Sequence, residues 1–162
     1  MTEEWRAINC APGYYVSDLG RVQKSDGRQI RVGHVTDGSL SAVLSIDRAS
    51  RPYLVRKLVA EAFCEPTVRN SDTVVHLDGQ KDNCHAENLA WRPRWFAWKY
   101  SHQFNEPVRS RWMYPIRVVQ TGEEFGSLIE AGMHFGMLWE DIHLSAIEGK
   151  VTYPFGYVFE WV

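Results

Sequence analysis

The sequence has few cysteines, and they are not spaced for a disulfide framework or a zinc ribbon. Cys10, Cys64 and Cys84 are the three cysteines in 162 residues, and no C-x-x-C pair is present. An odd number of single cysteines is typical of a protein in a reducing compartment. The chain also lacks an apolar run of membrane-spanning length and a pattern typical of a signal peptide. We therefore expect a cytoplasmic protein with no membrane association.

The chain also lacks an overall basic charge, and tight DNA binding through its whole surface is therefore not expected from composition alone. Its 18 lysines and arginines are outnumbered by 20 aspartates and glutamates, and the net charge is −2. Residues 1–120 carry 17 basic against 13 acidic side chains, whereas residues 121–162 carry one against seven. This asymmetry predicts two working surfaces with different partners. No phosphate-binding loop or covalent nucleophile constellation is present, so we expect no small-molecule substrate.

Apolar residues, by contrast, are plentiful: 44% of the chain is hydrophobic and 13% aromatic, which is ample for a globular core. The strongest local pattern begins at Leu54, where apolar residues at helical spacing predict a helix that ends near Pro66. The β-branched run 73–75 then predicts a strand that delivers His76 to a tight turn, in which Gly79 can take a positive φ.

Three patterns come one after another here: LVAEAF, V-H-x-D-G and D-N-x-x-x-E-N-L-x-W. Together they resemble the HNH motif of phage and intron homing endonucleases, which have a ββα-metal fold. The resemblance implies that His76 is a general base that activates water for attack on a DNA phosphate, and that Asn88 orients its imidazole. It also implies a divalent metal, Mg²⁺ or Mn²⁺, at the scissile phosphate, and a phage or prophage origin.

The two positions that supply metal ligands in that family are aliphatic in this chain. The residue before the histidine is Val75, and the second ligand position, in the next helix, is Ala97. Hard cations need oxygen donors, so we expect a weakened or inactive nuclease site. Candidates for substitute ligands are Asp78 first, then Asp82, His85 and His102. The two aspartates fit equally well as turn residues.

The N-terminal segment, 3–24, resembles a short modular segment found in many of these nucleases. Its residues predict a hairpin with one strand around Tyr15 and a return strand over 21–23. Arg21 and Lys24 are candidates for DNA phosphate contacts. The alternative is a small hairpin that only packs its aromatic residues under a sheet.

The next segment predicts strands over 29–32 and 40–46 and a hairpin tip over 47–52. Basic residues gather at this tip and at the start of the helix after it. They are candidates for phosphate contacts, although charged loop tips are usually just solvated. These residues are Arg48, Arg51, Arg56 and Lys57.

Basic and aromatic residues interleave over 92–117, with six basic residues and one acid. Pro93 suits a helix start, and the residues after it are too aromatic for a plain surface helix. This composition is typical of a DNA or RNA surface, and equally of a protein interface. The candidate nucleic-acid contacts are Arg92, Arg94, Lys99, Arg109 and Arg111.

The C-terminal segment resembles the helix-turn-helix module that comes after many homing nuclease domains. It predicts a strand over 116–119, a helix capped by Ser127, a second helix over 140–147 and a closing strand. In that module the second helix enters the major groove. Here this helix carries Glu140 and Asp141, which phosphates would repel. A protein partner for the acidic segment is therefore the more economical expectation.

These observations predict an α+β chain in four parts. They are a β-rich segment over 1–52, a ββα-metal HNH domain over 53–104, a linker over 105–115, and a helix-turn-helix-like α/β module over 116–162. The favoured function is binding to DNA, or to a protein of the nucleic-acid machinery, by a nuclease relative that no longer cuts. The alternative is an active, metal-dependent DNA nickase.

Overall fold

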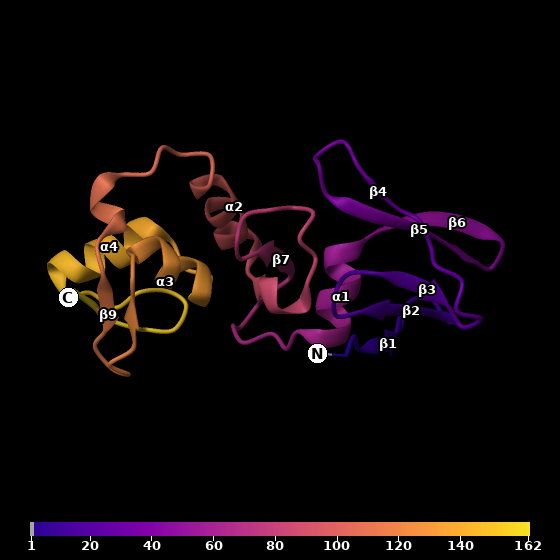
Figure 1. Cartoon of the computed structure of the whole chain (residues 1–162), viewed down its shortest axis with the longest axis horizontal. Coiled ribbons are helices and arrows are strands. Elements are labelled where there is room, and N and C mark those ends of the chain that lie inside the picture. Colours follow the sequence, from indigo (N-terminus) through magenta and orange to yellow (C-terminus); the bar gives the residue numbers. More distant parts are fainter. Residues whose placement is uncertain (1) are drawn as a thin grey trace. The chain divides into compact units, whose positions relative to one another are not determined.

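The computed structural model describes residues 2–162 and divides the chain into two compact units, Met1–Pro93 and Arg94–Val162 (Figure 1). Both units combine antiparallel β-sheet with helices, which confirms the α+β class. Over residues 2–162, the structure contains no helix with the length and apolar character needed to cross a membrane. The division into four parts stays a prediction.

The first sheet, in the order β1-β2-β3, contains the predicted hairpin. Val16 lies opposite Val22 in the register between β2 and β3. Gly20, in the turn between them, has φ +83°, and a Cβ placed on it would lie 3.0 Å from Cys84 Cβ. Glycine is therefore required here both by the backbone and by the close approach of another loop. The strands are β1 (Trp5–Ala7), β2 (Tyr14–Ser17) and β3 (Val22–Lys24).

The second sheet, β4-β5-β6, corrects the predicted hairpin tip. β5 spans Leu40–Ile46, as predicted, but the tip is only Asp47 and Arg48, both at positive φ. β6 (Ala49–Leu54) therefore includes Pro52, which is tolerated because β6 is an edge strand. The predicted strand over 29–32 is also displaced, because β4 spans Val32–His34.

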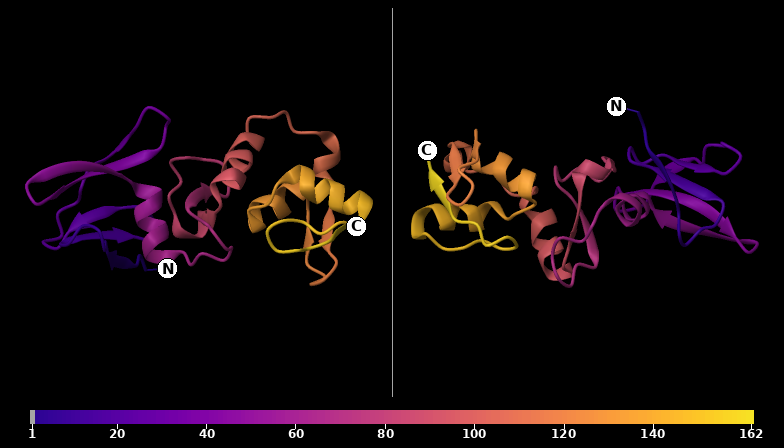
Figure 2. Two further views of the ribbon diagram at one scale, coloured as in Figure 1. Left: turned by 180° about the vertical axis from the view of Figure 1, so that it is seen from behind. Right: turned by 90° about the horizontal axis from the view of Figure 1, so that it is seen from below.

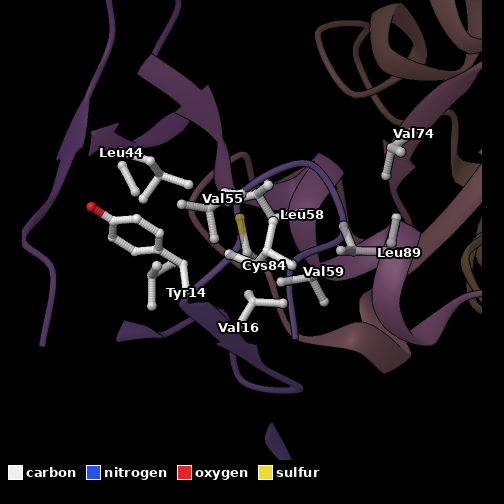
Figure 3. Close-up of a cluster of buried hydrophobic side chains, with 14 residues drawn as sticks. Tyr14, Val16, Leu44, Val55, Leu58, Val59, Val74, Cys84 and Leu89 are labelled. Carbon is white, nitrogen blue, oxygen red and sulfur yellow. The ribbon is translucent and has the colours of Figure 1, made fainter. Parts of the chain in front are cut away.

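Helix α1, Val55–Phe63, joins the elements of the first unit into one core. Val55, Leu58 and Val59 are buried against side chains of both sheets, as Figure 3 shows with Val16 and Leu44 beside them. The helix ends before Pro66, as predicted. Burying an aliphatic side chain stabilises a fold by about 1.5–3 kcal/mol, so this helix is a firm support for the strand and loop that come after it.

The strand after α1 carries the candidate base. β7 (Thr73–His76) pairs antiparallel with β8 (Leu89–Arg92), and His76 lies opposite Leu89. A turn in which Gly79 has φ +74°, a polar loop and the short 3₁₀ helix η1 (Ala86–Asn88) connect the two strands. His76 and Asn88 therefore stand at the two ends of one closed loop.

In the second unit, helices α3 and α4 cover a three-stranded sheet in the order β10-β9-β11 (Figures 1 and 2). Ser127 caps α3 by accepting from Glu130 N, as predicted, and Gly136 ends it in the left-handed region. Gly132 lets the two helices approach, since a Cβ there would lie 2.4 Å from Trp139 Cδ1. The elements are α2 (Arg94–Gln103), η2 (Ser110–Met113), β9 (Ile116–Val118), β10 (Glu124–Phe125), α3 (Leu128–Phe135), α4 (Trp139–Glu148) and β11 (Phe159–Trp161).

Candidate functional site

His76, the last residue of β7, is enclosed by the first unit and is only 7% exposed. Burial, together with the positive charge of Arg56, lowers the pKa of His76 to about 4. The imidazole is therefore neutral at physiological pH and keeps a lone pair that can accept a proton. The same low pKa makes it a weak base, well below the range near 7 that favours general-base catalysis.

The ring of His76 faces a buried thiol. Its Nε2 lies 3.9 Å from Cys84 Sγ, and Cys84 is 2% exposed. Burial raises the pKa of the Cys84 thiol to about 11. Because both groups are held in their neutral forms, the pair has none of the thiolate character that a nucleophilic cysteine needs. Sequence reasoning missed this contact, and its only signal was the position of Cys84 in the loop between His76 and Asn88.

Asn88 hydrogen-bonds the loop and not the imidazole that the family resemblance implied. Its Oδ1 accepts from Asp78 N (3.1 Å), and its Nδ2 donates to Asp78 Oδ1 (2.9 Å) and to Asn83 O (2.9 Å). Its backbone carbonyl accepts from Leu77 N (2.8 Å). Asn88 therefore fixes the shape of the loop that begins at His76.

The carboxylate of Asp78 is engaged at both oxygens. Oδ1 accepts from Gln80 N (2.8 Å) as well as from Asn88, and Oδ2 accepts from Asn83 Nδ2 (2.7 Å). Burial by itself would raise the pKa of Asp78, but the hydrogen bonds from Asn83, Gln80 and Asn88 outweigh it, and the pKa is lowered. This is the pattern of an aspartate that stabilises a turn.

The two positions expected to ligate a metal are occupied by buried aliphatic side chains. Val75 is 2% exposed and Ala97, in α2, is 4% exposed, and neither side chain has a donor atom. Within residues 2–162, no group of three or more His, Cys, Asp or Glu side chains is placed to hold a metal. Mg²⁺ and Mn²⁺ require oxygen-rich coordination. Within the first unit, Asp78, Asp82 and His85 are thus not gathered into a group of this kind.

The basic candidates of the first unit differ in how free they are. Arg48 and Arg51 are exposed at and beside the β5–β6 hairpin tip. Arg92, in β8, is 2% exposed, and its Nη1 donates to Trp91 O (2.8 Å), so we leave it out of any DNA surface. The other four have partners within the unit: Arg21 with Glu3, Lys24 over the Tyr14 ring, Arg56 with Ser39, and Lys57 with Glu61.

The basic candidates of the second unit lie on or near α2. Arg94 and Lys99 are exposed on that helix, and Arg111 is exposed in η2. Arg109 forms an ion pair with Glu140 (3.1 Å). That pair neutralises one of the acids on α4, so the charge of this helix is partly balanced within its own unit.

Comparison with solved structures finds a similar fold in the HNH homing endonuclease I-HmuI. That structure is described as one of DNA binding and cleavage by I-HmuI. The two chains are 24% identical, the TM-score is 0.56, and the alignment covers 98% of each chain. No family model matches the sequence, and no curated protein matches it. At this level of identity the likeness concerns the fold: over nearly its whole length, the chain has a fold similar to that of an HNH homing endonuclease.

Proposed function

We propose that this protein binds DNA through an HNH homing-endonuclease fold and does not cut it. One observation carries the proposal: nearly the whole chain shares the fold of a protein described as binding and cleaving DNA, while the first ligand position is the buried aliphatic Val75. A fold alone does not fix a function, so the argument depends on the chemistry of the site.

That chemistry favours binding without cleavage. Metal-assisted hydrolysis of a phosphodiester needs a cation that neutralises charge on the phosphate and a base that activates water. Neither Val75 nor Ala97 can ligate a cation, and the oxygens of Asp78 are occupied by hydrogen bonds within the loop. His76 is a weak base turned towards Cys84. The loop keeps its shape but lacks the groups for the reaction.

DNA binding itself needs cations on the surface, and the exposed basic residues supply them. Phosphate contacts from Lys and Arg provide most of the sequence-independent affinity for DNA. Arg48 and Arg51 on the β5–β6 hairpin, and Arg94 and Lys99 on α2, are exposed and suited to this role. The net charge of −2 does not oppose this, because residues 1–120 carry 17 basic against 13 acidic side chains and the excess of acids lies in residues 121–162.

The test combines a binding assay and a nicking assay on supercoiled DNA that carries fragments of the source genome, with Mg²⁺ or Mn²⁺. We expect binding that weakens steeply with salt, and no nicking beyond that of the His76→Ala variant. Nicking that requires both the metal and His76 would overturn the non-cutting part of the proposal and make the protein an active nickase.

A second experiment asks whether the missing donors are the reason for inactivity. Val75→Asn combined with Ala97→Asn supplies an oxygen donor at each ligand position. We expect metal-dependent nicking to arise in the double variant and in neither single variant. If the double variant is folded and still does not nick, the loss of activity has a further cause, such as the burial of His76.

A protein partner is a second candidate function for the acidic C-terminal segment. Along α4, Leu144 is 39% and Ile147 is 61% exposed, and Glu140 and Glu148 are exposed on the same helix. Apolar side chains flanked by acids suit a protein better than a phosphate backbone. We expect Leu144→Ser with Ile147→Ser to change DNA affinity by less than about twofold, within the error of a binding assay. A large drop would instead place α4 on DNA.

A further inference from the structure

The outward face of α2 carries two exposed tryptophans in a basic setting. Trp95 is 56% and Trp98 is 62% exposed. Arg94, Lys99 and His102 are exposed on the same helix, at spacings that bring them close to the two tryptophans. The opposite face of α2 is buried and consists of Phe96, Ala97, Tyr100 and Gln103.

The charges that α2 itself carries favour an anionic partner for this face, although Asp141 of α4 lies close enough to interact with Lys99. No aspartate or glutamate is present in residues 92–105, so the charged groups along the helix are all basic. Large aromatic side chains that protrude together from a surface usually mark a binding site. Nucleic acid matches both the basic charge and the exposed rings of this face, because it is a polyanion whose bases are flat and can stack.

The two tryptophans are held differently. Trp95 packs against Tyr153 (5.2 Å between ring centroids) and Phe96 (5.7 Å) within its own unit. Trp98 stacks on His102, with centroids 4.0 Å apart and an interplanar angle of 30°. His102 Nδ1 lies 2.8 Å from Trp98 O, which fixes the imidazole behind the indole. One face of the Trp98 ring is thus supported, and the high exposure of the side chain leaves the other to solvent.

We propose that the open face of Trp98 is a stacking platform for a nucleobase that has left the stack of the duplex. Arg94 and Lys99 lie on the same helix and would contact the phosphates beside that base. This inference rests on the proposed DNA binding and adds the form of DNA that the protein prefers. Stacking of a base on an aromatic side chain is tolerant of sequence, because every base has a π-face.

The test uses two short duplexes of one sequence, one fully paired and one with a single unpaired 2-aminopurine at its centre. Fluorescence anisotropy gives the Kd, and 2-aminopurine emission reports stacking of the base. We expect the protein to bind the bulged duplex about 10-fold more tightly, a ratio equivalent to about 1.4 kcal/mol, and to quench the probe.

Substitutions assign the preference to Trp98. Trp98→Ala is expected to reduce the ratio of the two Kd values to about one and to abolish the quenching, while Trp98→Phe retains part of both because a smaller ring can still stack. Tyr114→Ala is the matched control, since Tyr114 is 61% exposed in the same unit but lies outside α2. This control should behave as the wild type does.

The outcomes separate this inference from the proposed function. If neither duplex binds, DNA binding is overturned and the platform with it. If both duplexes bind equally well, or if Trp98→Ala keeps the preference for the bulged duplex, only the platform is overturned.

Discussion

Two regions of the molecule differ in how their polar and aromatic side chains are engaged. These regions are the loop between His76 and Asn88 and the outward face of α2. In the loop, the polar groups are satisfied by one another: Asn88 and Asn83 donate to Asp78, and His76 faces Cys84. On α2, Trp98 is 62% exposed. A motif that matches a catalytic pattern can thus have its polar groups engaged with one another, while large side chains outside that motif face the solvent.

The largest effect on this comparison is expected when the hydrogen bonds that hold the loop are removed. Asn88→Ala removes three side-chain hydrogen bonds and leaves Asp78 N and Asn83 O without this partner. We expect the free energy of unfolding to fall by about 3 kcal/mol, because polar groups lose their partners in a partly buried site. Urea denaturation measures this. Asn105→Ala, at an exposed position, should change it by less than about 0.5 kcal/mol.

Acid should also lower the stability of the first unit. The pKa of His76 is about 4 in the folded protein against 6.5 for the free side chain, so between these values the unfolded chain binds the extra proton. Stability is therefore lost as the pH falls from about 6.5 to about 4, by about 2–3 kcal/mol. His76→Gln should flatten this part of the pH profile of urea midpoints.

The pKa of His143 is lowered too, so its contribution to the pH dependence of stability must be distinguished from that of His76. Burial lowers its pKa as well, so it also adds to the acid lability of the chain. A His143→Gln variant isolates its part. An unchanged profile in His76→Gln, with His143 still present, would contradict the neutral, buried state of His76.

A smaller effect is expected at the first ligand position. Val75→Asn places an amide where the native side chain is 2% exposed, and we expect a loss of about 1–3 kcal/mol from the buried polar group. Val43→Asn is the matched control, because Val43 is 55% exposed in β5, and it should cost less than about 0.5 kcal/mol. Equal losses in the two variants would argue against the burial of Val75.

The smallest effect on stability is expected on α2. Trp98→Ala should leave the free energy of unfolding within about 0.5 kcal/mol of the wild type, because the side chain is mostly in solvent. Trp95→Ala should cost more, since it loses its contacts with Tyr153 and Phe96. Thermal unfolding of the two variants tests this order. A large loss of stability in Trp98→Ala would mean that this ring supports the fold.

Much of the fold is encoded in local signals of the sequence. Strand β5 and the Ser127 cap of α3 lie where alternation and a capping serine predict them. The predicted hairpin tip was wrong because Asp47 and Arg48 adopt positive φ, which is uncommon for residues other than glycine, so that the turn closes in two residues. The sheet then extends through Pro52, a residue that sequence reasoning assigns to a loop.

The candidate site was less predictable than the fold. The position of His76 at a strand end is indicated by the β-branched run before it, but its contact with Cys84 depends on how a polar loop folds back. The role of Asn88 depends on partners five and ten residues away, Asn83 and Asp78, which no periodicity specifies. The burial of Arg92 could not be predicted either, because in the sequence it is one of several basic residues in an aromatic segment.

The close approach of Gly20 to Cys84 bears on how such a protein can be recombined. Ala86 N also donates to Asp18 O (2.7 Å), so the N-terminal hairpin and the His76 loop share a tight contact, and a Cβ at residue 20 would crowd Cys84. A crossover that exchanged the N-terminal strands with those of a relative would have to bring its own glycine at this turn. We therefore expect a chimera that exchanges the hairpin and the loop together to fold better than one that exchanges the hairpin alone.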